Sequence, residues 1–110
     1  MAELRATQFF HANVSTVNPA KTTAWTVPAG RRIIVRSVAM RNLSLGVTQT
    51  LYVLVGGIVV KSQIITPPGS SGDSVEWRPW IVVDEGETLQ LTVGTAGSVG
   101  VVVSGSNHFI

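Results

Sequence analysis

The stretch TLYVLVGGIVVKSQI (residues 50–64) limits the possible folds more than any other part of the chain. Two glycines, Gly56 and Gly57, separate two runs of aliphatic and β-branched residues. A two-residue hairpin turn needs positive φ at its centre, which glycine adopts without steric cost. The stretch therefore predicts a β-hairpin. The predicted pairs are Val55–Ile58, Val53–Val60 and Leu51–Ser62 on one face, and Leu54–Val59 and Tyr52–Lys61 on the other.

The two faces of this hairpin differ in polarity, but both carry apolar residues near the tip. The first face is suited to a core. The second face carries Tyr52, Leu54 and Val59, so we expect a second partner to cover it. These residues are therefore candidates for an interface with another subunit.

In the rest of the chain, short apolar runs likewise alternate with turn residues. Such alternation indicates an all-β sandwich or barrel, and no window shows a helical period free of Gly, Pro or β-branched crowding. We predict an antiparallel, jelly-roll-like β-sandwich of about eight short strands in one domain over residues 1–110, with residues 1–21 as an N-terminal arm or edge strand. The expected strands span residues 8–16, 22–27, 32–43, 48–55, 58–65, 74–83, 88–93 and 99–104.

Two stretches, VPAGRRIIV and VDEGETLQL, share one spacing of valine, glycine and aliphatic residues. In each, the glycine (Gly30 or Gly86) follows two residues suited to a type I turn. Pro28 and Asp84 are expected at the first central position of these turns. We expect both glycines to have positive φ and to lead the chain from one sheet into the other.

Composition excludes several functions. Only 13% of the 110 residues are charged and the net charge is +2, which is not the basic footprint of a nucleic-acid binder. The chain has no cysteine, so disulfides and thiolate chemistry are excluded. The longest apolar stretch, LYVLVGGIVV, is too short to span a membrane. We expect no signal peptide, no membrane partner and synthesis in a cytoplasm.

The strand after the first corner carries several arginines. Regular alternation places Ile33, Val35, Ser37, Ala39 and Arg41 on the core face, and Arg32, Ile34, Arg36, Val38 and Met40 on the outer face. Arg32 and Arg36 then lie side by side on the surface. They either form cross-strand ion pairs on a solvated face, which we favour, or contact an acidic partner.

No group of residues has the spacing of a catalytic or metal site, so we predict neither enzymatic activity nor a cofactor. His11 and His108 lack a nearby carboxylate. Asp84, Glu85 and Glu87 crowd one turn but do not match a calcium loop. The motifs NVS at Asn13 and NLS at Asn42 are treated as chance matches to the glycosylation sequon.

The tryptophans are the basis for an alternative function, carbohydrate or receptor binding. The stretch EWRPWIVV places Trp77 and Trp80 on either side of Arg78–Pro79. We expect core and seam packing for these rings, with Trp77 the more exposed. The alternative is a carbohydrate- or receptor-binding module in which Trp77 stacks on a sugar.

Together the stretches WTVPAGRRIIVRSVAMRNLS, LYVLVGG, WRPWIVVDEGETLQLTV and AGSVGVVVSGS resemble the small β-sandwich modules of tailed-phage virion accessory proteins, which include head decorations, neck and tail appendages and fibres. The DEGE corner departs from the Asn-Ala-Gly-Asp of that family. The resemblance implies a non-enzymatic virion protein present in many copies. Its partners would be capsid, neck or tail subunits and copies of itself, with a trimer as the preferred oligomer.

Overall fold

The computed structural model describes residues 7–110, and within this range the chain forms nine β-strands and no helix. The strands are β1 (Thr7–Val14), β2 (Thr22–Thr26), β3 (Arg31–Asn42), β4 (Gln49–Val55), β5 (Ile58–Ile65), β6 (Ser74–Trp77), β7 (Ile81–Val83), β8 (Thr88–Val93) and β9 (Val99–Phe109). The all-β class predicted from the sequence is confirmed.

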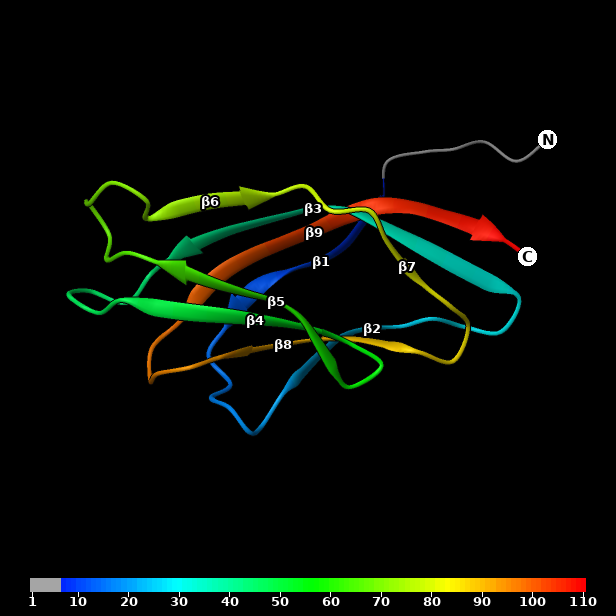
Figure 1. Ribbon diagram of the computed structural model, residues 1–110, viewed down its shortest axis with the longest axis horizontal. Helices are drawn as coiled ribbons and strands as arrows, with labels where there is room; N and C mark the ends of the chain where they lie inside the picture. Colours follow the sequence, from blue (N-terminus) through cyan, green and yellow to red (C-terminus); the bar gives the residue numbers. More distant parts are fainter. Residues whose placement is uncertain (1–6) are drawn as a thin grey trace.

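The strands form two antiparallel sheets that pack face to face (Figure 1). The first sheet has the order β1-β9-β3-β6, and the short β7 also pairs with β3. The second sheet has the order β2-β8-β4-β5. Because the chain crosses repeatedly between the sheets, strands distant in sequence become neighbours, as in a jelly roll. The predicted jelly-roll-like sandwich is confirmed. The part of the expected N-terminal arm that falls on residues 1–6 lies outside the described residues.

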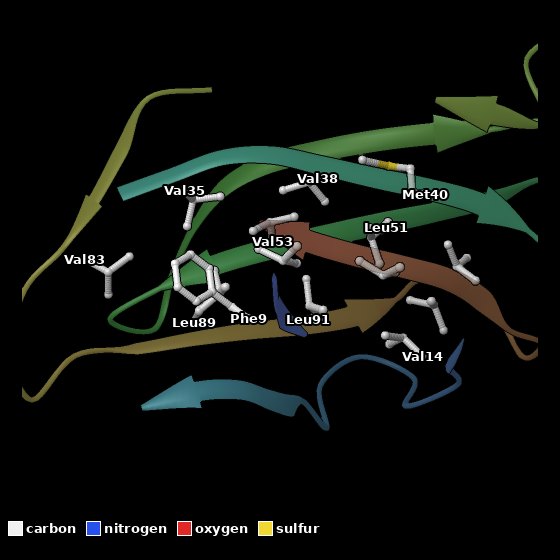
Figure 2. Close-up of a cluster of buried hydrophobic side chains, with 14 of the residues drawn as sticks. Phe9, Val14, Val35, Val38, Met40, Leu51, Val53, Val83, Leu89 and Leu91 are labelled. Atoms are coloured by element: carbon white, nitrogen blue, oxygen red, sulfur yellow. The ribbon is translucent and has the colours of Figure 1, made fainter. Parts of the chain in front are cut away.

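The core lies between the two sheets. Side chains from β1, β3, β4, β7 and β8 converge there (Figure 2). The fully buried residues include Ile33, Val35, Leu51, Val53, Leu89 and Leu91. Each buried aliphatic side chain of this size contributes roughly 1.5–3 kcal/mol relative to an exposed one, so this layer is the main source of stability.

One predicted strand is in fact two. The sequence predicts a continuous strand over residues 74–83, but β6 and β7 pair with successive parts of β3. Pro79 lies between them and has no N–H group to donate to the ladder. The edge of the first sheet is therefore interrupted at residues 78–80.

A β-bulge in β3 changes which residues face the core. The register of β3 against β9 shifts at Arg36. Before the bulge Ile33 and Val35 are buried, and after it Val38 and Met40 are buried instead. The predicted face assignment is wrong beyond the bulge, because the extra residue of a bulge reverses the alternation.

A glycine on β9 accommodates this bulge. A Cβ on Gly105 would lie 1.9 Å from the carbonyl oxygen of Ile34 and 3.0 Å from the backbone nitrogen of Arg36. Both atoms belong to the backbone of β3 and cannot move aside as a side chain would. The close approach of the two strands therefore requires glycine at this position.

The β4–β5 hairpin forms at the predicted turn but with a shifted register. Gly56 and Gly57 have φ values of 58° and 81°. Two predicted pairs are confirmed, Val55–Ile58 and Leu54–Val59. Three are wrong, and the structure instead pairs Val53 with Lys61, Tyr52 with Ser62 and Leu51 with Gln63. A bulge at this point inserts Val60 as an unmatched residue, which moves every later pair by one position.

The two corners adopt the expected backbone conformation at their glycines, with φ of 78° at Gly30 and 80° at Gly86. Each turn is closed by an amide that donates to the carbonyl of Pro28 or Asp84, at 3.2 and 3.1 Å. These residues therefore occupy the first position of their turns, one place earlier than the sequence predicted. Positive φ at the third position is typical of type II rather than type I turns.

The two corners also contact each other. The N–H of Val27 donates to the carbonyl of Glu87 (3.0 Å), and the N–H of Gly86 donates to the carbonyl of Val27 (2.8 Å). The N–H of Gly30 donates to the Glu85 carboxylate (2.7 Å). The spacing shared by VPAGRRIIV and VDEGETLQL thus corresponds to two turns that meet at one end of the sandwich.

The end of β3 is fixed by a buried amide. Asn42 is fully buried, and its Nδ2 donates to three backbone carbonyls. The acceptors are Val47 at 2.7 Å, Ile65 at 3.1 Å and Thr66 at 3.1 Å. Its Oδ1 accepts from the N–H of Ser44 at 2.8 Å. The Asn-x-Ser motif therefore ties the loop after β3 to the end of β5.

Candidate functional site

The predicted surface arginines both lie on the outer face of the first sheet, but they have different partners. Arg32 donates through Nε to Asp84 Oδ1 at 2.7 Å, and both side chains are about half exposed. The guanidinium of Arg36 lies over the ring of Trp80, 4.1 Å from its centroid. Arg32 thus forms the expected ion pair, whereas the bulge directs Arg36 onto an aromatic ring.

The exposure of the two neighbouring tryptophans is the reverse of the prediction. Trp77 pairs with the buried Val38, packs against the core and carries Lys61 Nζ at 5.5 Å from its ring centroid. Trp80 is 64% exposed. Because the strand breaks at Pro79, Trp80 lies outside the β-ladder and points away from the core.

Trp80 borders a hollow of about 500 Å³ on the outer surface. Its lining residues are Arg36, Ser37, Glu76, Arg78, Pro79 and Trp80. Glu76 and Arg78, which are two positions apart in the sequence, form an ion pair. The hollow lies where the bulge of β3 faces the interruption between β6 and β7, so two irregularities of the backbone create it together. Sequence analysis missed this site, although Pro79 within an apolar run was its signal.

A second candidate surface lies on β5. We call the four exposed aliphatic residues of this strand the hairpin patch: Ile58 (70% exposed), Val59 (50%), Val60 (41%) and Ile64 (63%). β5 is an edge strand of its sheet. Scattered apolar residues are common on protein surfaces, but a group on one strand indicates an interaction surface.

The same strand carries two features that oppose pairing with another strand at its free edge. Lys61 pairs with Val53 of the core face, so it is an inward-directed charge on an edge strand. The bulge at Val60 twists the edge. Both devices protect edge strands from edge-to-edge association, so contact through side chains is favoured over strand addition.

The three hairpin residues predicted as an interface differ in accessibility. Val59 belongs to the hairpin patch and is exposed. Tyr52 is half-buried and lies against Gly94, where an added Cβ would be 3.4 Å from the ring. Leu54 is only 3% exposed. Leu54 is therefore already covered within the chain, and the exposed apolar surface lies on β5 instead. That these residues form an interface remains a prediction.

A shallow trough of about 500 Å³ crosses the outer face of the first sheet. Its lining includes Ala39, Gly100 and Val102, together with His11 and Glu76. Sequence analysis did not identify it, because it depends on the register that aligns these residues across four strands.

The carboxylates of Asp84, Glu85 and Glu87 stabilise the two corners. Asp84 binds Arg32, and Glu85 accepts from the N–H of Gly30. Glu87 accepts from the N–H of Asp84 at 3.0 Å, within its own turn. These carboxylates are therefore used by the two corners.

Within residues 7–110, no group of three or more His, Cys, Asp or Glu residues is placed to hold a metal ion. His11 pairs with Val102 on β9, whereas His108 pairs with Arg32 on β3, so the two imidazoles are far apart along β9. The described part of the chain also contains no helix long and apolar enough to cross a membrane.

The two sequon asparagines also differ. Asn13 is exposed on β1, whereas Asn42 is fully buried and hydrogen-bonded. A buried side chain that donates to three carbonyls is not accessible for glycosylation. The structural role of Asn42 explains the NLS motif, and no glycosylation is needed to account for it.

No protein-family model matches the sequence, and no curated protein sequence is similar to it. The fold is similar to that of the Drosophila NLP core, whose structure is described as giving insight into pentamer formation and histone binding. That match has 14% identity and a TM-score of 0.54, and it covers 93% of this chain and 99% of that chain. At this identity the similarity establishes a shared fold only.

Two viral structures give weaker matches. A pentameric capsid protein isolated from metagenomic phage sequences has 19% identity and a TM-score of 0.41, covering 88% of this chain and 61% of that chain. The infectious bursal disease virus Gt strain structure has 11% identity and a TM-score of 0.39, covering 94% of this chain and 32% of that chain. Both scores are below 0.5, so nothing about function follows from them.

Proposed function

We propose that the chain is a non-enzymatic structural protein of a tailed-bacteriophage particle. In this proposal it is a small accessory or decoration subunit that assembles in several copies on the head, neck or tail. It would be made in the host cytoplasm and reside in the virion. The resemblance of its corner and strand motifs to virion accessory modules supports the proposal. In this proposal the copies form a homo-oligomer, and a trimer is preferred.

The structural observation that supports it most is the hairpin patch. Four aliphatic side chains of one edge strand are 41–70% exposed in a protein with only 13% charged residues. Burying such side chains against a neighbour contributes about 25 cal/mol per Å² of apolar surface. On a symmetric particle the same patch is used in every copy, so a weak contact becomes firm through multivalency.

Lys61 and the bulge at Val60 define the kind of contact. Because they oppose strand addition, the neighbour should pack on the side chains of the hairpin patch without extending the sheet. The protein should therefore form closed oligomers or bind a particle surface, and should not form fibrils.

Sedimentation velocity at several concentrations tests the proposal. We expect the purified chain to self-associate, and a double variant with Ile58→Ser and Ile64→Ser to shift toward the monomer with an unchanged urea midpoint. Val82→Ser removes an aliphatic side chain that is 42% exposed on the other sheet and serves as the matched control. A wild-type monomer at every concentration that also fails to bind particles would overturn the proposal.

A further inference from the structure

We propose that the hollow beside Trp80 binds a saccharide, with a pyranose ring stacked on the indole face that Arg36 does not cover and hydroxyl groups hydrogen-bonded by Glu76 and Arg78. This inference goes beyond the proposed structural role and does not depend on it. It also moves the alternative carbohydrate site from Trp77, which packs against the core, to a residue that is accessible.

The indole of Trp80 can serve as a stacking platform. Trp80 is 64% exposed even with the guanidinium of Arg36 over its ring. An exposed indole is apolar on its faces, and the C–H face of a pyranose is apolar in the same way. Stacking the two removes both surfaces from water, while the sugar hydroxyls at the rim remain free to bond.

Several polar groups surround this platform. Glu76 and Arg78 are held together as an ion pair, which places an acceptor-only carboxylate beside a donor-only guanidinium. A vicinal diol matches this pair, because one hydroxyl can donate to the carboxylate while the next accepts from the guanidinium. Arg36 and Ser37 add further groups in the same hollow. A small-ligand site needs such convergent polar groups beside an apolar wall.

The backbone of the first sheet forms the hollow. β6 and β7 are separated at Pro79, and the bulge of β3 lies opposite this gap at Arg36. Gly105 on the far side of β3 permits the bulge. Bulges commonly redirect a side chain toward a functional site, and here the redirected side chain is that of Arg36, whose guanidinium lies over the Trp80 ring.

The charge of the hollow favours a saccharide over a nucleic acid. Two arginines face one glutamate, whereas nucleic-acid binding needs a stripe of basic residues to follow the phosphates. About half of the lining surface is polar, which is unlike the apolar centre of a protein interface. A sugar uses both the indole and the mixed donors and acceptors.

NMR of the ¹⁵N-labelled full chain tests the proposal. The protein has three tryptophans and so gives three indole N–H resonances, and the Trp80 resonance is assigned by its loss in Trp80→Phe. The probes are maltohexaose, chitotetraose, sialyllactose and an oligogalacturonate, each titrated to millimolar concentration. We expect at least one to shift the Trp80 resonance saturably while those of Trp25 and Trp77 stay unchanged. Comparing neutral and acidic probes identifies the type of sugar.

Variants separate binding from folding. Trp80→Ala should abolish binding measured by calorimetry, and Trp80→Phe should retain part of it. Glu76→Gln should weaken binding about tenfold, because it removes a charged hydrogen-bond partner. Arg32→Gln is the matched control, since Arg32 is an exposed arginine of the same strand outside the hollow.

Four results would overturn the proposal. The first is the absence of a Trp80 shift with all four saccharides. The second is equal binding by Trp80→Ala or Glu76→Gln. The third is a shift that depends on protein concentration alone, which would assign the hollow to an interface between copies. The fourth is a stronger response to a single-stranded oligonucleotide, which would assign it to nucleic acid.

Discussion

Replacing Gly105 by alanine should destabilise the protein severely, although the change adds only one methyl group. The added Cβ would lie 1.9 Å from the carbonyl oxygen of Ile34, whereas ordinary contacts of this kind begin at 3.4 Å. The neighbouring nitrogen of Arg36 would be 3.0 Å away. Because all these atoms belong to paired strands, β3 and β9 must move apart and the bulge must rearrange.

The cost can be worked from these contacts. Overpacking of a dense interior costs typically about 1–3 kcal/mol, and loss of one ladder hydrogen bond adds about 1 kcal/mol. We therefore expect Gly105→Ala to lower the free energy of unfolding by about 2–4 kcal/mol. The corresponding fall in Tm is about 10–20 °C for a domain of this size.

Gly100→Ala is the matched control on the same strand. A Cβ there would meet its nearest atoms, in Asn13 and Leu43, at 3.5 Å, and glycine in a strand carries an entropic cost. Its effect should stay within about 0.5 kcal/mol of wild type or be slightly stabilising. Urea unfolding followed by circular dichroism gives both values. Equal stability of the two variants would refute the proposed role of Gly105.

Three further predictions concern stability and use the same urea assay. Asn42→Ala should cost about 3 kcal/mol, because it leaves buried carbonyl acceptors without a donor; a loss below 1 kcal/mol would contradict the role assigned to this amide. Gly30→Val and Gly86→Val should each cost about 1–3 kcal/mol through backbone strain at positive φ, and tolerance at both sites would invalidate the corner assignment. Arg32→Ala should cost less than about 1 kcal/mol, because its ion pair with Asp84 is exposed; this small cost should decrease further as salt is added.

Local turn chemistry explains why much of the fold could be predicted. The positive φ of Gly30 and Gly86 and the two-glycine hairpin turn follow from residues within a few positions of each other. Alternation along short runs then indicated a sandwich. These signals are local, so they can be interpreted without knowing which strands become neighbours.

The features that were predicted wrongly from the sequence depend on partner strands. The bulges at Arg36 and Val60 add one residue relative to a neighbour that the sequence does not identify, and each reverses or shifts every later assignment. Gly105, which follows the valine run of β9, was a usable sign of such an irregularity. Pro79 was likewise a sign of the break that exposes Trp80 and turns Trp77 inward.

The interface residues are a different case. Leu54 was predicted as a contact because of its place on the outer face, but it is buried within the chain. The exposed apolar surface was found on β5, because exposure depends on how the edge strand twists at its bulge. A variant such as Leu54→Asp would therefore test folding, whereas variants of Ile58 and Ile64 test assembly.

We propose that this chain occupies a phage particle in several symmetric copies through the hairpin patch. The most direct measurement is electron cryomicroscopy of particles assembled with a chain that carries a fused C-terminal label. We expect label density at symmetry-related positions on the head, neck or tail, and loss of that density when Ile58 and Ile64 are replaced by serine in a chain that still folds. Particles without label density, or with equal density for the serine variant, would contradict the account.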